Sequence, residues 1–480
     1  MPERRRRNPA RSFRPRKPGK AASVTGIVLA VVRPGDLAAA RAQMGFSLAW
    51  HIVLACLGVG LPLLTVLAEW RGIRTGDQSY RLLARRWARA MGVLFAVGAV
   101  SGTILSFEMG LLWPGLMGTF GQVIGLPFAM EGIAFFIEAI FLGIYLYAWD
   151  RLEPRKHVLT GLPIIVAGIA SAFFVVCANA WMNQPRGFTL QDGRVTAVQP
   201  WAAMFNPAAP PQTVHMILAA VMVACFLTAS VYAVALLRGR RDRYHRLGFF
   251  LPLTIGAVVT PVQIVVGDWA ARFVANYQPT KLAAMEGVYH TGTHVPLTIG
   301  GIAQGDRLRY GLEIPDGLSL LVGYSPDTEI RGLDQVPRDR WPPVTGVHLA
   351  FDLMVGVGFF LLLVAVWLAV GAFLRRRRGR FLLPRAFWVF GLVAGPAAVV
   401  ALEAGWTVTE EGRQPWIVQG VMSVRDAVNP APGLMVGLWL VLVVYAGMTV
   451  GVVYVLRRLA KQTPVPVAPQ ERDVEDYPVT

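Results

Sequence analysis

Apolar runs of about 20 residues, long enough for an α-helix to cross the hydrocarbon core of a bilayer, recur along this 480-residue sequence. Only 16% of the residues are charged. A soluble domain carries about a quarter. The sequence therefore predicts an all-α polytopic membrane protein and excludes a soluble enzyme.

The apolar runs divide the chain into nine predicted transmembrane helices. Their approximate limits are 43–69, 88–112, 124–148, 158–182, 212–237, 248–272, 345–373, 385–406 and 433–457. A polar segment separates helices six and seven; loops of that length are usually functional or disordered, and its aromatic and apolar residues favour order. The predicted organisation is a basic, disordered N-terminal extension (1–40), helices one to six (41–272), an outer loop (273–344), helices seven to nine (345–460) and a C-terminal tail (461–480).

The basic residues give the predicted orientation. A net charge of +17 would suit a nucleic-acid-binding protein, but Lys and Arg concentrate next to apolar runs. The links and tail on one side of the bundle hold 23 of them, and the short links on the other side hold four. Basic links normally stay in the cytoplasm. The first helix is therefore predicted to begin outside, the C-terminus to be cytoplasmic, and no nucleic acid to be bound. The same rule disfavours "PERRRRNPARSFRPRKPGK" outside, so residues 1 to about 35 are expected to be an extension or a start-site artefact.

The three cysteines, Cys56, Cys177 and Cys225, lie in apolar runs and form no CxxC or CxxCH motif. Disulfides, iron–sulfur clusters and covalently attached haem are therefore not expected. All three are predicted to be small core residues.

Ionisable residues inside predicted helices are the main functional candidates, because a charge in hydrocarbon is costly. The helix directions place them, with one methionine, in the outer half of the bundle or near its middle. They are His51, Glu108, Glu131, Glu138, His215, Asp352, Met354 and Glu403. The inner half is predicted to hold almost no ionisable group and no acidic relay below Glu138.

The chemistry of these residues narrows the function without deciding it. A histidine and a methionine on different helices have the ligand types of a six-coordinate haem iron, although either residue can also be structural. Glu131 and Glu138 are seven residues apart and share one helix face. Such a pair could hold or pass protons, or be a structural pair bonded to Ser or Trp.

Several motifs, in order along residues 40–460, resemble subunit I of cytochrome bd-type quinol oxidases. They are "SFEMGLLWP" (106–114), "FAMEGIAFFIEAIFLG" (128–143), "WDRL" (149–152), "ANAWMNQP" (178–185), "TKLAAMEG" (280–287) and "GRQPW" (412–416) after "EAGW" (403–406). The ordered set is more specific than any one motif. The resemblance implies a nine-helix enzyme that oxidises quinol and reduces O₂ to water with two haem b groups, one low-spin and one high-spin, and one haem d.

The resemblance also implies ligand roles. His215 and Met354 match the axial pair of the low-spin haem b. His51 matches the axial histidine of one high-spin haem, and Glu403 matches the carboxylate associated with the other. Members of the family differ in which of these two residues serves haem d, so that assignment stays open.

Further roles follow from the same resemblance. Glu131 and Glu138 match an acidic pair in the proton route and haem pocket. In the outer loop, Lys281 and Glu286 match residues of the quinol site, where Glu286 would accept a quinol proton and Lys281 would bond the head group. Asp352 stands where some members hold an arginine beside the haem, so propionate contacts or the haem potential are expected to differ.

The "GRQPW" motif is expected to cap the outer end of the helix that carries Glu403. There Arg413 can pair with haem propionates, and Gln414 can bond nearby backbone or quinol. Trp416 is expected to fill the membrane interface beside the haem pocket.

The implied mechanism requires partners. Quinol, either menaquinol or ubiquinol, is expected to be oxidised at the outer loop, so that its protons leave on the outer face. Protons for O₂ reduction should come from the cytoplasm, partly through a second membrane subunit (subunit II), and small single-helix subunits are further expected partners. The implied location of this electrogenic respiratory-chain enzyme is the bacterial cytoplasmic membrane.

Three other functions remain open at this stage. A transporter would gather polar residues in mid-membrane, but often with internal repeats, and none is evident. A non-oxidase haem b electron carrier is the nearest alternative, although it usually needs paired histidines and only His51 and His215 lie deep in spans. A cofactor-free structural subunit would leave the buried carboxylates unexplained.

Overall fold

The computed structural model describes residues 33–378 and 384–461. Most of the predicted N-terminal extension and all but the first residue of the predicted C-terminal tail lie outside the described residues. The first helix begins at Pro34, so it includes the last residues of the segment that the sequence assigned to the extension.

Within these ranges, nine helical spans are long and apolar enough to cross a membrane. They are α1 (Pro34–Thr75), α2 (Gln78–Leu112), α3 (Pro114–Tyr147), α4 with α5 (Pro154–Thr160 and Leu162–Asn183), α7 (Ala209–Leu237), α8 (Arg243–Tyr277), α11 (Val344–Arg378), α12 (Arg385–Glu411) and α14 (Leu434–Lys461). The all-α polytopic fold predicted from the apolar runs is confirmed. Proline near the first position begins α1, α3 and α4, where its missing N–H has no helical partner to lose.

Small side chains let the central helices approach closely. α1 packs against α2, α5, α7 and α14, and α7 packs against α8 and α12. At the α1–α7 contact, a Cβ on Gly60 would lie 2.4 Å from the Cβ of Ala224, so only glycine fits. Ala220 and Ala229 are also buried along α7. Small residues are the usual packing device between membrane helices, because lipid already solvates apolar side chains.

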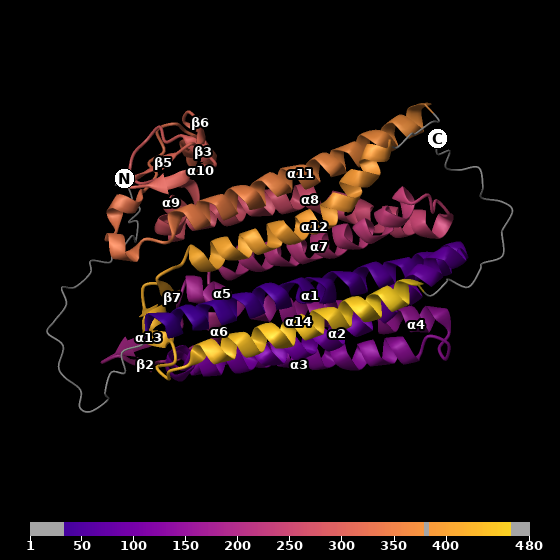
Figure 1. The fold of residues 1–480 in the computed structure, drawn as a ribbon, viewed down its shortest axis with the longest axis horizontal. Helices are drawn as coiled ribbons and strands as arrows, with labels where there is room; N and C mark the ends of the chain where they lie inside the picture. Colours follow the sequence, from indigo (N-terminus) through magenta and orange to yellow (C-terminus); the bar gives the residue numbers. More distant parts are fainter. Residues whose placement is uncertain (1–32, 379–383, 462–480) are drawn as a thin grey trace, which may run out of the picture. The chain divides into compact units, whose positions relative to one another are not determined.

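The connecting segments gather at two opposite ends of the bundle (Figure 1). Segments 184–208, 278–343 and 412–433 lie at one end, which we call the loop end. Its short elements besides those between α8 and α11 are β1 (Thr189–Gln191), β2 (Arg194–Thr196), α6 (Pro200–Met204), β7 (Trp416–Val418), β8 (Met422–Ser423) and α13 (Val424–Ala427). α4 and the α7–α8 link lie at the opposite end (Figure 1).

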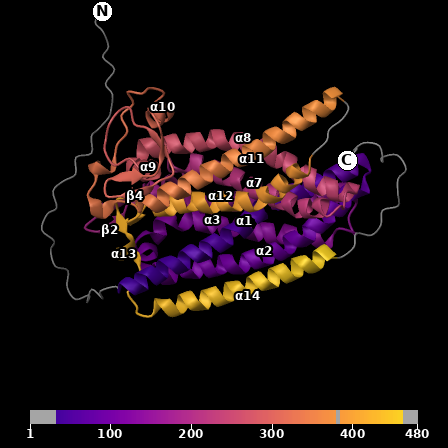
Figure 2. The same ribbon diagram turned by 45° about the horizontal axis from the view of Figure 1, so that its top comes forward.

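The segment between α8 and α11 is folded (Figure 2), and its buried apolar residues form one cluster with residues of α8 and α11. Its elements are α9 (Pro279–Glu286), β3 (Leu297–Ile299), β4 (Ile302–Gln304), β5 (Arg307–Arg309), β6 (Leu312–Ile314), α10 (Gly317–Gly323) and two 3-10 turns (Leu333–Gln335 and Arg338–Arg340). β3 pairs with β6 and β4 pairs with β5, both antiparallel. Leu282, Leu318 and Leu333 are buried together beneath these elements. This cluster and the contacts of α9 with α8 and α11 hold α9 against the bundle.

Candidate functional site

His51 lies on α1, and its ring contacts α2. Its Nδ1 is 2.7 Å from Ser101 Oγ, and that hydroxyl donates to the Gly98 carbonyl oxygen at 2.9 Å. The Ser101 oxygen is therefore left to accept from His51, which places the ring proton on Nδ1 and leaves the Nε2 lone pair free. A Cβ on Gly102 would meet the ring at 3.2 Å. A fixed tautomer with one free nitrogen is typical of a metal-binding histidine.

His215 lies on α7 beside α8. Its Nδ1 is buried and has no hydrogen-bond partner within the described ranges. Its Nε2 lies 3.3 Å from Gln263 Nε2, and a Cβ on Gly267 would come within 3.5 Å of the ring. Because buried polar atoms are nearly always paired, the free ring nitrogen indicates a place for a further group.

Met354 and Glu403 lie on adjacent helices, α11 and α12. A Cβ on Gly405 of α12 would lie 2.8 Å from Met354 Sδ, so the thioether faces α12. Glu403 projects from a different face of α12, since two residues turn a helix by about 200°. Its carboxylate lies within electrostatic range of Cys56 on α1, the helix that carries His51.

The acidic pair on α3 lies between α1 and α5. Ser171 Oγ of α5 donates to Glu131 Oε1 at 3.2 Å. The Glu138 carboxyl is buried and comes within 3.9 Å and 3.7 Å of the Cβ positions of Gly58 and Gly168. The serine bond matches the structural alternative for Glu131, whereas Glu138 has glycine backbone on two sides.

Glu108 lies at the centre of a buried polar cluster on α1, α2 and α14. Its Oε1 accepts from Gln43 Nε2 at 2.9 Å and from Ser47 Oγ at 3.0 Å. Three atoms of this cluster have no partner in the part of the chain that the structure describes: Glu108 Oε2, Gln43 Oε1 and the Tyr445 hydroxyl. Unpaired buried groups of this kind are the usual setting of an ordered water.

A second buried polar cluster, at the opposite end of the bundle, was missed from the sequence. His157 Nδ1 lies 2.6 Å from Glu69 Oε1, and the Tyr145 hydroxyl donates to Glu69 Oε2 at 2.6 Å. All three side chains are buried. The prediction that the inner half holds almost no ionisable group was therefore wrong. The seven-residue spacing from Glu138 to Tyr145 was an available signal, because it places both on one face of α3.

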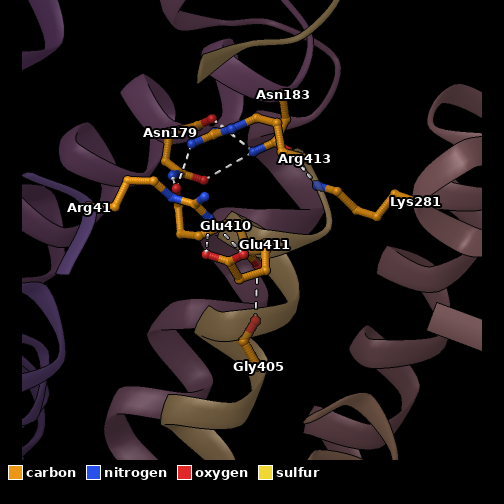
Figure 3. A network of polar contacts seen from close by, with 9 residues as sticks. Arg41, Asn179, Asn183, Lys281, Gly405, Glu410, Glu411 and Arg413 are labelled. Atoms are coloured by element: carbon orange, nitrogen blue, oxygen red, sulfur yellow. Dashed lines mark hydrogen bonds and ion pairs between the residues drawn. The ribbon is translucent and has the colours of Figure 1, made fainter. Parts of the chain in front are cut away.

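Lys281 connects α9 to the loop-end terminus of α5 (Figure 3). Its Nζ donates to Asn183 Oδ1 at 2.5 Å, and the side chain is buried. A Cβ on Gly412 would lie 3.0 Å from Lys281 Cγ. Burial lowers the pKa of Lys281 to about 7, and the nearby Arg413 guanidinium adds to the effect, while Glu410 opposes it.

Arg413 is 3% exposed and belongs to the same network (Figure 3). Its Nη2 donates to Glu410 Oε2 at 2.5 Å, and Asn179 Nδ2 donates to Glu410 Oε1 at 2.6 Å. Arg413 Nε and Nη1 are buried without a partner among residues 33–378 and 384–461. Two free, buried N–H groups of a guanidinium can receive a carboxylate or another anion.

The next residues of the motif join α12 to the outer segment. Gln414 is half-buried, and its backbone N–H donates to the Glu411 carbonyl oxygen at 3.1 Å. Trp416 begins β7, and the Arg340 guanidinium lies 5.8 Å from the centre of its ring. At the motif's other flank, Glu411 makes an exposed ion pair with Arg41 at 3.0 Å (Figure 3).

Glu286 ends α9 and faces a different part of the molecule from Lys281. The two residues are five apart, which separates them by about 140° around a helix. Burial raises the pKa of Glu286 to about 8, with a contribution from the Asp352 carboxylate of α11. Asp352 accepts the Gly300 backbone N–H at 2.5 Å. α9 therefore presents Lys281 to α5 and α12, and Glu286 to α11.

Comparison with known proteins decides the family. The family model for cytochrome bd terminal oxidase subunit I matches residues 39–464. The chain belongs to the cytochrome bd terminal oxidase subunit I family. It is 37% identical, over 90% of its length and 98% of the relative, to a Bacillus subtilis (strain 168) protein named as a cytochrome bd menaquinol oxidase subunit I. It is 26% identical to the cytochrome bd-II ubiquinol oxidase subunit 1 of Escherichia coli (strain K12), over 88% of this chain and 96% of that one.

A solved structure agrees with this family. A chain of the bd oxidase from Geobacillus thermodenitrificans superposes with a TM-score of 0.83 at 39% identity, covering 89% of this chain and 99% of that one. The resemblance inferred from the motifs is confirmed: this is a subunit of a bacterial terminal respiratory quinol oxidase, an oxidoreductase of the membrane. It works with haem, quinol and a second subunit. A non-oxidase electron carrier is not favoured.

The residues present fit haem. His51, His215 and Met354 each face a glycine of a neighbouring helix, and both histidines keep a ring nitrogen free. Each glycine lets the ligand side chain lie directly against the backbone of the neighbouring helix, at the place that a Cβ would otherwise take. The unpaired N–H groups of Arg413 can receive propionate carboxylates.

Proposed function

We propose that the chain holds two haem b groups and one haem d, and that His215 and Met354 are the residues that would hold the low-spin haem b. His51 and Glu403 serve the two high-spin haems, one of which is haem d. The observation that carries this proposal is the free ring nitrogen at each histidine, opposed by a glycine across the helix contact. When bound, these haems supply the electron transfer from quinol to O₂.

The quinol site is proposed at α9. With a pKa of about 7, Lys281 is a neutral amine in about half of the molecules at pH 7, while Glu286, with a pKa of about 8, keeps its proton. A neutral amine can accept a proton, and a carboxylic acid can donate a hydrogen bond. We therefore assign proton acceptance to Lys281 and binding of a quinol oxygen to Glu286, the reverse of the roles first expected from the resemblance.

The "GRQPW" residues support both sites. Arg413 is proposed to bind a haem propionate through Nε and Nη1, which have no other partner in the described part of the chain, and its charge disfavours the protonated form of Lys281. Gln414 is proposed to bond the quinol or nearby backbone, and Trp416 to close the site toward the long outer segment. The substrate is menaquinol or ubiquinol, since relatives are named for each.

Proton movement is proposed to be directional. The distribution of basic links favours the loop end outside and the C-terminus in the cytoplasm, so quinol protons leave on the outer face. Glu131 and Glu138 pass protons for O₂ reduction. Subunit II supplies part of their route from the cytoplasm, and small single-helix subunits are further proposed partners.

One spectrum tests the haem assignment: dithionite-reduced minus air-oxidised difference absorption of the purified complex, with pyridine haemochrome analysis. We expect a chlorin band in the red together with two b-type haems per chain. Haem b alone would overturn the proposed haem d and the oxygen chemistry assigned to the high-spin pair.

A further inference from the structure

Two residues of α11, one helical turn apart, bind both backbone polar groups of Gly300. Gly300 lies in the loop between β3 and β4. Asp352 Oδ2 accepts the Gly300 N–H at 2.5 Å, and His348 Nε2 lies 2.9 Å from the Gly300 carbonyl oxygen. Gly300 and Gly301 both have positive φ, a conformation that glycine adopts without strain. The turn can therefore present both groups of one residue to one helix.

The same histidine also binds α9. His348 Nδ1 lies 2.7 Å from the Met285 carbonyl oxygen. Met285 is in the last turn of α9, where carbonyl oxygens have no partner within the helix. His348 thus gives the Met285 carbonyl oxygen a partner that α9 itself does not provide, at the residue directly before Glu286.

The His348 ring is fully buried and has three polar partners. The Met285 carbonyl oxygen lies beside Nδ1, and the Gly300 carbonyl oxygen and Asp352 Oδ2 lie 2.9 Å and 3.4 Å from Nε2. Buried polar groups are stable when they are hydrogen-bonded, so loss of the ring would leave polar groups in two separate parts of the segment without a partner.

We propose that His348, with Asp352, is the positioning residue that fixes the long outer segment on the helix of Met354 and thereby sets the position of α9 for quinol oxidation. The inference rests on the proposed quinol site at α9. Met285 and Gly300 belong to separate parts of the segment, and His348 binds both at once. Met354 lies six residues further along α11, so the anchor connects the proposed quinol helix to the proposed haem ligand through one rigid element.

Total activity would fall both if His348 positions α9 and if it only stabilises the fold. The test therefore uses two other measurements. The first is the rate of tryptic cleavage of the segment in the purified complex, at sites such as Arg307 and Arg309 on β5. The second compares the KM for a short-chain quinol with O₂ uptake driven by tetramethyl-p-phenylenediamine, an electron donor used as a probe independent of the quinol site.

The variants are His348→Gln, whose N–H donors sit on a single nitrogen and therefore cannot replace both ring nitrogens, and His348→Phe, which has no donor. The matched control is His290→Gln, because the His290 side chain in the same segment is 71% exposed. We expect cleavage and quinol KM to rise roughly tenfold in His348→Gln and further in His348→Phe, as for the loss of one and then two buried hydrogen bonds. Diamine-driven uptake, haem content and the control should stay unchanged.

Unchanged cleavage and unchanged KM in both His348 variants would overturn the anchor. If neither variant assembles, Asp352→Asn decides through cleavage alone, because Asp352 also acts on the pKa of Glu286 and so on the quinol KM. The variant keeps an oxygen for the Gly300 N–H but loses the charge that strengthens this bond, so cleavage must rise, and cleavage equal to wild type overturns the proposal. Glu286→Gln separates the two proposals. A wild-type quinol profile in Glu286→Gln would reject that residue's role at the quinol site, whereas faster cleavage in His348→Gln would still support the anchor.

Discussion

Lys281 Nζ lies 2.5 Å from Asn183 Oδ1, so α9 of the long outer segment is joined to the terminus of α5 through one buried hydrogen bond. The "GRQPW" motif adds Arg413, which donates to Glu410 at the end of α12 (Figure 3). Three motifs far apart in the sequence therefore meet at one place. Burial is the main cause of the lowered pKa of Lys281, and Arg413, the haem-pocket candidate, lowers it further. This second contribution couples the proposed quinol site to the proposed haem site electrostatically.

The first prediction is a bell-shaped pH dependence of kcat/KM for quinol. Lys281 gains its accepting, neutral form as pH rises through about 7, and Glu286 loses its donating, neutral form as pH rises through about 8. Activity should therefore rise through about 7 and fall above about 8. Steady-state quinol oxidation measured between pH 5.5 and 9.5 checks this. Glu286→Gln, which cannot ionise, should lose the falling limb, and a fall that persists in this variant would contradict the assignment.

The second prediction concerns Ser101, which fixes the His51 tautomer. Ser101→Ala removes the acceptor for Nδ1–H, and loss of such supporting bonds typically costs about 10–100-fold in metal affinity or activity. We expect one high-spin haem to be lost selectively in a haem-dissociation titration, with the low-spin haem band retained. The control is Ser106→Ala on the same helix, because the Ser106 hydroxyl donates only to a carbonyl one turn earlier. Equal haem retention in both variants would argue against His51 as a ligand.

Part of this architecture could be predicted from the sequence, because some information is local along the chain. The length of an apolar run predicts a span, and a charge inside a run marks a candidate such as His51 or Glu403. Partners distant in sequence are not local. Glu69 and His157 are 88 residues apart, and neither position reveals the other. Lys281 and Glu286 of α9 likewise face different helices. The five-residue spacing between them does not reveal which helix packs on which face of α9.

The third prediction concerns Gly405 of α12, which lies against the Met354 thioether. Gly405→Ala would place a Cβ 2.8 Å from Met354 Sδ, closer than carbon and sulfur can lie without displacement, and overpacking of this kind costs about 1–3 kcal/mol. We expect a weakened or shifted low-spin haem band in the reduced-minus-oxidised spectrum. Gly356→Ala on α11 is the matched control, since its Cβ would meet no atom within 4 Å. A normal low-spin band in Gly405→Ala would count against Met354 as the ligand.

The fourth prediction concerns stability at the opposite end of the bundle. Glu69→Ala leaves His157 and the Tyr145 hydroxyl buried without their shared partner. Breaking a buried pair on one side typically costs about 3–5 kcal/mol, so the thermal unfolding temperature of the purified complex should fall clearly. Glu153→Ala at the same end is the control: its ion pair with Lys156 is 3.8 Å long and exposed, and such pairs contribute about 0–1 kcal/mol. Equal unfolding temperatures for the two variants would reject a stabilising role for the cluster.

The last prediction separates proton supply from electron entry. Glu138 is buried against glycine backbone of α1 and α5, whereas Glu131 also has a serine partner. Replacing either carboxyl with an amide removes a group that can carry a proton and keeps its volume. Glu138→Gln should therefore slow O₂ reduction strongly, and Glu131→Gln less so, because the serine can still order a water beside the amide. Flow-flash kinetics of the fully reduced complex measure this step directly. Reduction of the low-spin haem by quinol should be unchanged in both variants, and wild-type O₂ kinetics in both would show that protons reach the haem pocket by another route.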